Sequence, residues 1–442
     1  MYGAETSKRL DEAGIGPGDR IRVAKKGKVY EGVLMPRPEI GNGNILIIKQ
    51  DDGYNIGVNA DGAGIEKLRG KAEGMVFPKA QMRQGSSLPK VRLVYTGGTI
   101  GAKIDYKTGG VYMLTKPEEL LYEVPELSDI AEISVSQTSS IASEDMSSDE
   151  WAAIANEVSR SINNGARGVI VTLGTDSMHY ASAALSFMLR DLNAPVVLTG
   201  AQRSPDRGSS DAFQNLICSA HLAAKSDMAE VGICMHDSSS DGRCAFLRGT
   251  KARKMHTSRR DAFRPINAKP IAFVDADGTM AYVSSYKKAD WKGKVTPLTG
   301  FERKVAFVKA FPNSDPDIID YYAGRGYRGI VIEGMGLGHT PASTVKKELS
   351  WIPHVRSATD SGIVIGITSQ CIYGRVNPNV YRNLRLLHNA GAIHCEDMLP
   401  ETAYVKLGWL LGNYKPEEAR AMLSRNLAGE ISRRTTYNEF LI

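Results

Sequence analysis

The sequence predicts an α/β protein whose body has two domains built on mainly parallel sheets, preceded by a small N-terminal SH3-like β-barrel. Three observations support this fold class. Short β-rich runs separated by Gly, Asp and Asn turns fill residues 1 to about 75. From Val91 onward, strand, loop and helix signals alternate, which is typical of a doubly wound sheet. A second alternating unit begins near Lys304.

The first unit, residues 1–78, is expected to form the barrel, because short strands with turn residues between them are typical of small closed sheets. Its function is either to dock a partner protein or RNA, or to be a structural appendage. Polar residues 79–90 are expected to form a linker. The expected strands lie at 20–24, 28–35, 44–49 and 54–58.

The second unit, residues 91–274, is expected to be the larger, catalytic α/β domain. Residues 275–303 connect it to a smaller α/β domain at 304–442. In the larger domain the expected strands are 91–95, 133–137, 168–173, 195–199 and 231–236, with helices near 148–163, 178–191 and 210–225. In the smaller domain they are 305–308, 329–332 and 363–367, with helices near 400–411 and 416–427.

Length and composition narrow the class of protein. A chain of 442 residues with 42% apolar content can bury large cores. No run approaches the ~18 to 20 apolar residues of a membrane span, so we expect a cytoplasmic protein with no membrane contact. The five cysteines include no Cys-x-x-Cys pair and the eight histidines show no ligand spacing, so no metal site is expected.

The formal charge of +6 is compatible with a nucleic-acid partner but modest. Seven of the basic residues fall in Arg248–Arg264 against a single acid, Asp261. At the surface such a segment would attract phosphates. The alternative is an internal use, in which one lysine serves catalysis and the others form a solvated face.

Two strands end in loops that carry hydroxyl groups. Val91–Tyr95 leads into Thr-Gly-Gly-Thr-Ile-Gly, which places Thr99 beside glycine N–H groups that no side chain covers. A second apolar strand ends at Thr175 and Asp176. Because neighbouring parallel strands share one crevice at their carboxyl ends, both threonines can face one ligand. The carboxylate can polarise a hydroxyl, and a cation from Arg248–Arg264 would complete a proton path.

These loops resemble the bacterial-type L-asparaginases. Thr-Gly-Gly-Thr-Ile at 96–100 and Gly-Thr-Asp-Ser-Met at 174–178 are similar to the two signatures of that family. Segments 143–146 and 248–254 are similar to its substrate-holding loop and to the segment that carries its catalytic lysine. The resemblance runs from about residue 90 to the C-terminus. It implies an asparaginase-like fold and a catalytic quartet of Thr99, Thr175, Asp176 and Lys254.

The resemblance also implies roles for the quartet. Lys254 would act on Thr175, while Asp176 would orient Thr175 or the substrate's ammonium group. Hydrolysis of an amide needs a nucleophile, and an ordinary threonine hydroxyl needs help to act as one. The sequence leaves open whether Thr99 forms the covalent intermediate or Thr175 activates a water.

Further residues are expected to bind substrate or to assist. Gly98 and Gly174 let backbone approach the ligand closely, and the N–H groups near Gly98 and Thr99 are our candidates for the oxyanion hole. A tyrosine after the first signature assists in related enzymes; Tyr112 fits best and Tyr106 is a rival.

In the Ser143-Glu-Asp-Met loop, Ser143 is expected to contact the substrate. Glu144 stands where many relatives carry glutamine. Its carboxylate would pair with the substrate's α-ammonium and so select free amino acids. The alternative is that Glu144 caps the helix that starts near Ser147.

The added N-terminal domain, the basic charge and the intact quartet together resemble the D-type subunits of archaeal glutamyl-tRNA(Gln) amidotransferases. That resemblance implies an amidohydrolase that uses glutamine or asparagine to make ammonia within a ligase complex. A second amidotransferase subunit, of the E type, with ATP and Mg²⁺, would convert Glu-tRNA(Gln) to Gln-tRNA(Gln). This chain would need no cofactor and would form a homodimer within a heterotetramer.

Three other functions compete with this one. A stand-alone cytosolic L-asparaginase would use the same quartet. A dinucleotide-binding enzyme would use Gly97-Gly98-x-x-Gly101, but the full Gly-x-Gly-x-x-Gly is missing and the second loop has no role there. A catalytically inactive binding module is disfavoured by the intact quartet. The sequence does not choose between glutamine and asparagine.

Overall fold

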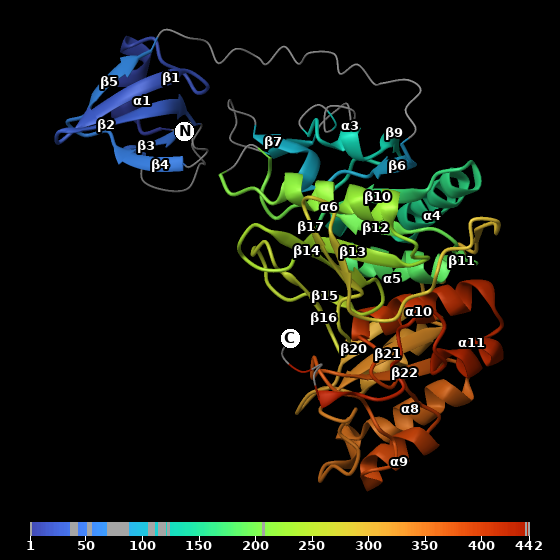
Figure 1. The fold of residues 1–442 in the computed structure, drawn as a ribbon. Coiled ribbons are helices and arrows are strands. Elements are labelled where there is room, and N and C mark those ends of the chain that lie inside the picture. Colours follow the sequence, from blue (N-terminus) through green and yellow to red (C-terminus); the bar gives the residue numbers. More distant parts are fainter. Residues whose placement is uncertain are drawn as a thin grey trace.

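The computed structural model describes residues 2–35, 43–50, 55–68, 88–104, 111–113, 121, 124–205, 208–437 and 440. Along the chain it contains a small N-terminal domain, a larger α/β domain and a smaller one (Figure 1). Residues 36–42 of the N-terminal domain and 79–87 of the expected linker lie outside the described part.

The N-terminal domain is a five-stranded antiparallel sheet in the order β4-β3-β2-β1-β5 with one helix, α1 (Ala4–Glu12). Buried side chains of β1 and β3 alternate with half-buried or exposed ones, as expected of strands with one face on a core. The helix was not predicted, since Leu10 is its one large apolar residue and gives no helical period. The strands are β1 (Arg20–Lys25), β2 (Lys28–Leu34), β3 (Ile45–Lys49), β4 (Asn55–Asn59) and β5 (Gly64–Lys67).

The larger domain is built on an eight-stranded sheet in the order β18-β17-β14-β13-β12-β10-β6-β9. The five strands from β9 to β13 in this order are parallel, as predicted, and three antiparallel strands extend the sheet beyond β13. The parallel strands are β6 (Lys90–Tyr95), β9 (Glu132–Gln137), β10 (Gly168–Thr172), β12 (Val196–Thr199) and β13 (Val231–His236). The antiparallel strands are β14 (Arg243–Arg248), β17 (Ala272–Asp275) and β18 (Met280–Tyr282).

Helices cover both faces of this sheet, so its central strands are apolar throughout. Every residue of β10, Gly-Val-Ile-Val-Thr, is buried. Helices α4 (Ser148–Asn163) and α5 (Met178–Met188) lie on one face. Helix α6 (Ala212–Lys225) and the short α3 (Leu127–Ile130) lie on the other.

The smaller domain has a four-stranded parallel sheet in the order β20-β21-β22-β23. Helices α10 and α11 pack on the face toward the larger domain, and α7, α8 and α9 belong to the far side (Figure 1). Three of its helices, α7 to α9, were not predicted. The elements are β20 (Val305–Lys309), α7 (Asp317–Gly324), β21 (Gly329–Gly334), α8 (Trp351–Asp360), β22 (Val364–Ser369), α9 (Arg382–Asn389), β23 (Ile393–His394), α10 (Pro400–Asn413) and α11 (Pro416–Leu423).

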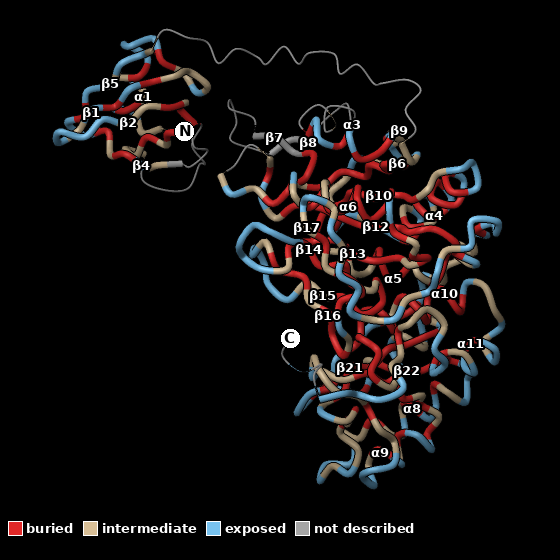
Figure 2. Tube along the Cα trace, in the orientation of Figure 1, coloured by how far each residue is buried: buried red, intermediate tan, exposed pale blue. Residues whose placement is uncertain are grey.

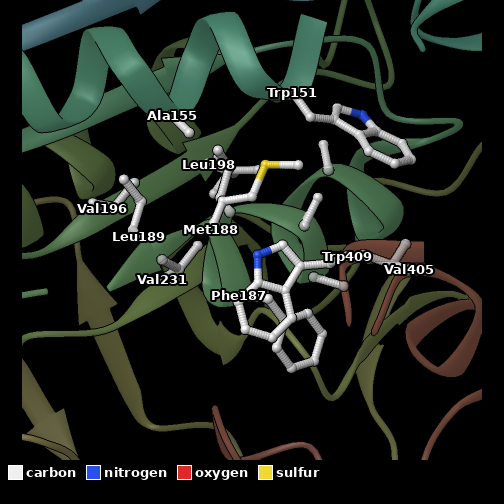
Figure 3. Packing of buried hydrophobic residues seen from close by; sticks show 14 of the residues in the cluster. Trp151, Ala155, Phe187, Met188, Leu189, Val196, Leu198, Val231, Val405 and Trp409 are labelled. Atoms are coloured by element: carbon white, nitrogen blue, oxygen red, sulfur yellow. The ribbon is translucent and has the colours of Figure 1, made fainter. Parts of the chain in front are cut away.

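The core of the two α/β domains is continuous. Phe187 of α5 stacks on Trp409 of α10 with ring centroids 5.7 Å apart, and both lie in the cluster that Figure 3 shows at close range. Figure 2 shows buried segments continuing from α5 into α10. Aromatic burial of this size contributes strongly to a domain contact. Helix α10 is therefore fixed against α5.

The stretch between the two sheets also contributes structure. Within residues 275–303, β18 pairs with β17 at the edge of the large sheet. Strand β19 (Thr296–Pro297) pairs with β11 (Leu189–Arg190) beside α5.

All five cysteines are free; four are buried and Cys371 is exposed.

Candidate active site

The predicted loops start at one level of the large sheet. In the parallel ladders Tyr95 is opposite both Gln137 and Thr172, and Thr172 is in turn opposite Thr199. The first loop is tied to the second where Thr96 Oγ1 donates to Thr172 O at 2.9 Å. Neighbouring parallel strands thus deliver their loops to one edge, as the sequence predicted.

Glycines allow the two signature loops to touch. Gly98 has a φ of +88°, a conformation that favours glycine. A Cβ built on it would lie 2.4 Å from Gly174 N, which is closer than real atoms approach. Thr99 and Thr175 each follow one of these two glycines, so both hydroxyl-bearing residues adjoin this backbone contact. Thr99 begins a 3₁₀ turn that ends at Gly101.

The predicted substrate loop joins the same place. A Cβ on Gly174 would lie 2.7 Å from Ser143 Oγ, so Ser143 packs directly on the second signature. The two loops are also joined by a hydrogen bond in which Ser177 Oγ donates to Ser143 O at 2.5 Å. Ser143 is buried, and the exposed Glu144 follows it.

Glu144 does not cap the helix that follows. Helix α4 is capped by Ser147, whose side chain accepts from Asp149 N, and Glu150 completes the capping box. The helix-capping interpretation of Glu144 is therefore wrong, because its place is filled. The interpretation of Glu144 as a partner of the substrate's ammonium group stays a prediction.

The predicted lysine reaches the second signature from a two-stranded hairpin. Strand β15 (Ala252–Lys254) pairs with β16 (Phe263–Pro265), and the Lys254 side chain leaves its end. Lys254 Nζ donates to Thr175 Oγ1 at 2.8 Å and to Asp176 Oδ1 at 2.7 Å. The lysine side chain is 10% exposed while that of Asp176 is 68% exposed. The structure thus brings three of the quartet into direct contact, with the carboxylate facing solvent.

The assisting tyrosine stays a prediction. Tyr112 lies in β8 (Val111–Met113), which forms a hairpin with β7 (Ala102–Ile104) directly after the first signature. Tyr112 pairs with Lys103 across this hairpin. The rival, Tyr106, lies outside the described residues.

The segment Arg248–Arg264 is not a free basic patch. Each of its seven Lys and Arg side chains forms an ion pair with a carboxylate. These pairs are Arg248–Glu230, Lys251–Asp397, Arg253–Glu401, Lys254–Asp176, Arg259–Asp261, Arg260–Asp241 and Arg264–Asp261. The expectation of a phosphate-attracting field is wrong, because carboxylates that lie outside the segment, together with Asp261, neutralise it.

Three residues near the lysine were not assigned a role from sequence. His179 lies directly after the second signature; burial, with the positive charges of Arg253 and Lys254, lowers its pKa to about 4. Its imidazole is therefore neutral at neutral pH. Arg253 pairs with Glu401 of α10, and burial raises the pKa of that carboxyl. No motif carries this pair, since Glu401 is far away in the chain.

Groups that could hold a metal lie elsewhere. Among the described residues one cluster of this kind occurs, Asp317 and Asp320 of α7 with His354 of α8. It stands on the far side of the smaller domain's sheet and shares no residue with the quartet.

In the part of the chain that is described, no helix is long and apolar enough to span a bilayer.

Comparisons with known proteins agree with this geometry. The families "Asparaginase, N-terminal" and "Glutaminase/Asparaginase C-terminal domain" match residues 90–287 and 304–423. The thermostable L-asparaginase from Thermococcus kodakarensis aligns with a TM-score of 0.68 and 28% identity, covering 78% of this chain and 99% of that one. L-asparaginase I from Vibrio cholerae aligns with a TM-score of 0.68 and 25% identity, covering 78% of this chain and 100% of that one. The body is that of an asparaginase-type amidohydrolase.

The N-terminal domain identifies the narrower family. Residues 15–68 match the "GatD N-terminal domain". The D-type subunit of the glutamyl-tRNA(Gln) amidotransferase of Pyrococcus furiosus is 47% identical over 442 residues, covering 98% of this chain and 99% of that protein. Its counterpart in Methanothermobacter thermautotrophicus is 45% identical over 441 residues, covering 99% of each. The chain belongs to this family of D-type glutamyl-tRNA(Gln) amidotransferase subunits. The full-length match disfavours a stand-alone L-asparaginase.

Proposed function

We propose that this chain hydrolyses the side-chain amide of free glutamine or asparagine and supplies the ammonia to an E-type partner subunit. That partner would convert Glu-tRNA(Gln) to Gln-tRNA(Gln). The observation that carries the proposal is the contact of Lys254 Nζ with Thr175 Oγ1 and Asp176 Oδ1, at 2.8 and 2.7 Å, beside the Gly98–Gly174 contact.

The quartet supports a proton path for amide hydrolysis. The Lys254 ammonium donates to Thr175 Oγ1 and holds this hydroxyl where it can relay the proton that the attacking hydroxyl or water loses. Attack on the amide carbon breaks the C–N bond, and the departing nitrogen takes up the relayed proton and leaves as ammonia. Either Thr99 makes the attack and its ester is then hydrolysed, or Thr175 activates a water that attacks directly.

Carboxylates near the threonines suit a free amino acid. Glu144 is exposed beside Ser143, and most of the Asp176 side chain faces solvent. We assign these carboxylates to the substrate's α-ammonium group, which a peptide-bound residue lacks. Ser143, packed on Gly174, would contact the same end of the substrate.

The remaining parts of the assembly belong to the proposal. Amide hydrolysis by hydroxyl, carboxylate and ammonium groups needs no cofactor in this chain, so ATP and Mg²⁺ would bind the partner that activates the tRNA-linked carboxylate. The N-terminal domain would dock that partner or the tRNA. We propose a cytoplasmic homodimer within a heterotetramer, with no membrane contact.

The test is to time ammonia release from glutamine and from asparagine. It compares the chain alone, the chain with its partner subunit, and both with Glu-tRNA(Gln). We expect slow release by the chain alone and faster release with partner and charged tRNA, through a population shift of the loop after Thr99. Equal, fast release under all three conditions would point instead to an unregulated asparaginase.

A further inference from the structure

The strand that carries Lys254 is held from the smaller domain on both sides of its first residue. On one side of Ala252, Lys251 Nζ lies 2.7 Å from Asp397 Oδ2. On the other, Arg253 lies 3.0 Å from Glu401 Oε1. Asp397 precedes α10 by three positions and Glu401 is its second residue. One ion pair thus joins α10 to the strand, and a second joins the segment just before α10 to the residue just before the strand.

Backbone contacts add to these ion pairs. Thr402 Oγ1, on α10, donates to Thr250 O at 3.1 Å. Thr250 Oγ1 in turn donates to Ala428 O at 3.1 Å. Three of the four residues that precede Lys254 are therefore bound to the smaller domain, while Lys254 itself is bound to the larger one.

Burial restricts the geometry of the two ion pairs. The side chains of Lys251 and Asp397 are 1% and 0% exposed, and Asp397 Oδ1 also accepts from Ser432 N at 2.9 Å. A buried pair with its remaining lone pairs satisfied holds one geometry, since any displacement leaves a charge unpaired. The side chains of Arg253 and Glu401 are 25% and 9% exposed. This second pair is better suited to mutation because its loss leaves a less deeply buried charge.

The same helix also fixes the other half of the site. Helix α10 stacks Trp409 on Phe187 of α5, and α5 begins at Met178, two residues after Asp176. Helix α10 therefore contacts both the strand that delivers the ammonium group and the helix behind the loop that receives it. The separation of Lys254 from Thr175 depends on where α10 lies.

We propose that Glu401 and Asp397 are positioning residues for the amide hydrolysis. Acting through Arg253 and Lys251, they hold the Lys254 ammonium in hydrogen-bonding range of Thr175 and Asp176. The smaller domain thereby takes part in the chemistry without touching the reacting atoms. The inference rests on the proposed role of Lys254.

The test compares kcat and KM for ammonia release in the full chain with its partner and tRNA. The variants are Glu401→Gln, Arg253→Met and the two combined. Each single change should lower kcat about tenfold with KM within about twofold, because reacting groups displaced by a fraction of an ångström lose rate rather than affinity. The double variant should be no slower than the slower single one, since both changes break one contact.

The control is a side-chain ion pair of similar burial at the end of β14: Arg248–Glu230, 2.7 Å apart, with side chains 20% and 11% exposed. Glu230→Gln should lower the melting temperature about as much as Glu401→Gln while leaving kcat within about twofold. If both variants lower kcat equally, or if Glu401→Gln raises KM alone, the positioning role is refuted. Lys254→Met in parallel separates the outcomes: if that variant stays active, the assignment of Lys254 fails instead.

Asp397→Asn is the second arm, matched by Glu157→Gln, which removes a carboxylate that is 6% exposed from its ion pairs with Arg92 and Arg160 in the larger domain. Both remove the charge of a buried carboxylate and should lower the melting temperature. At a temperature where circular dichroism shows both folded, Asp397→Asn should lose more kcat. Equal losses would count against the proposal, and if either variant fails to fold, the Glu401 arm decides.

Discussion

Replacing Lys254 by Met should abolish most activity while the chain stays folded. The ammonium group makes two hydrogen bonds, one to the buried Thr175 hydroxyl and one to the 68% exposed Asp176. A charged bond to a buried group is worth about 1.5–3 kcal/mol, and an exposed ion pair about 0.5–1 kcal/mol. Together they supply about 2–4 kcal/mol to the transition state, or about 30- to 10³-fold in rate.

The assay is the initial rate of ammonia release at saturating glutamine and asparagine, with the melting temperature measured alongside. The control is Lys288→Met, which breaks an exposed pair with Asp227 at 3.5 Å and should leave the rate unchanged. A Lys254→Met enzyme that keeps more than about a tenth of the wild-type kcat would refute the reasoning, because neither bond would then act in the transition state.

Three further predictions test other parts of the molecule. Gly98→Ala should lower stability by roughly 1–3 kcal/mol and kcat about 100-fold, because its Cβ would press on Gly174 N. The control is Gly165→Ala, at a φ of +96° with no atom within 4 Å of the added Cβ. It should show the same backbone strain and keep the wild-type rate. Folded His179 has a pKa of about 4 against an ordinary 6.5, so the unfolded chain binds more protons between these values. The free energy of unfolding should fall as pH drops from 6.5 to 4, and His179→Asn should reduce the slope measured in urea by up to about 1.4 kcal/mol per pH unit; an unchanged slope would mean that another group titrates. A chain starting near Pro78 should fold and bind substrate but bind its partner more weakly in pull-down titrations, and unaltered binding would exclude a docking role for the N-terminal domain.

Much of the fold was predictable because parallel strands are buried on both faces. Runs such as 168–172 are apolar without interruption and end in glycine or threonine, so both their position and their loops stand out. Helices α7 and α9 carry shorter apolar patterns of eight residues each and were missed. Their stability comes from packing on the sheet rather than from local sequence.

The contact of Lys254 with Thr175 and Asp176 was expected partly from the strand ends and partly from the resemblance that pointed to Lys254. Thr99, Thr175 and Asp176 lie at strand ends, where local sequence determines the loop. The pairing of Lys251 with Asp397 and of Arg253 with Glu401 was not, because partners some 146 residues apart carry no motif. The sequence of Arg248–Arg264 by itself therefore shows seven cations and only one acid, while the other carboxylates that balance them lie elsewhere in the chain.

Neutralisation of that segment changes how solutes should approach the site. Its seven cations meet six carboxylates, so little net field extends from it into solution. Free glutamine and asparagine are zwitterions without net charge and gain nothing from long-range attraction. Substrate capture should thus be nearly independent of ionic strength, whereas any association with the polyanionic tRNA should weaken steeply as salt rises. A salt titration should therefore separate substrate capture from any association with tRNA.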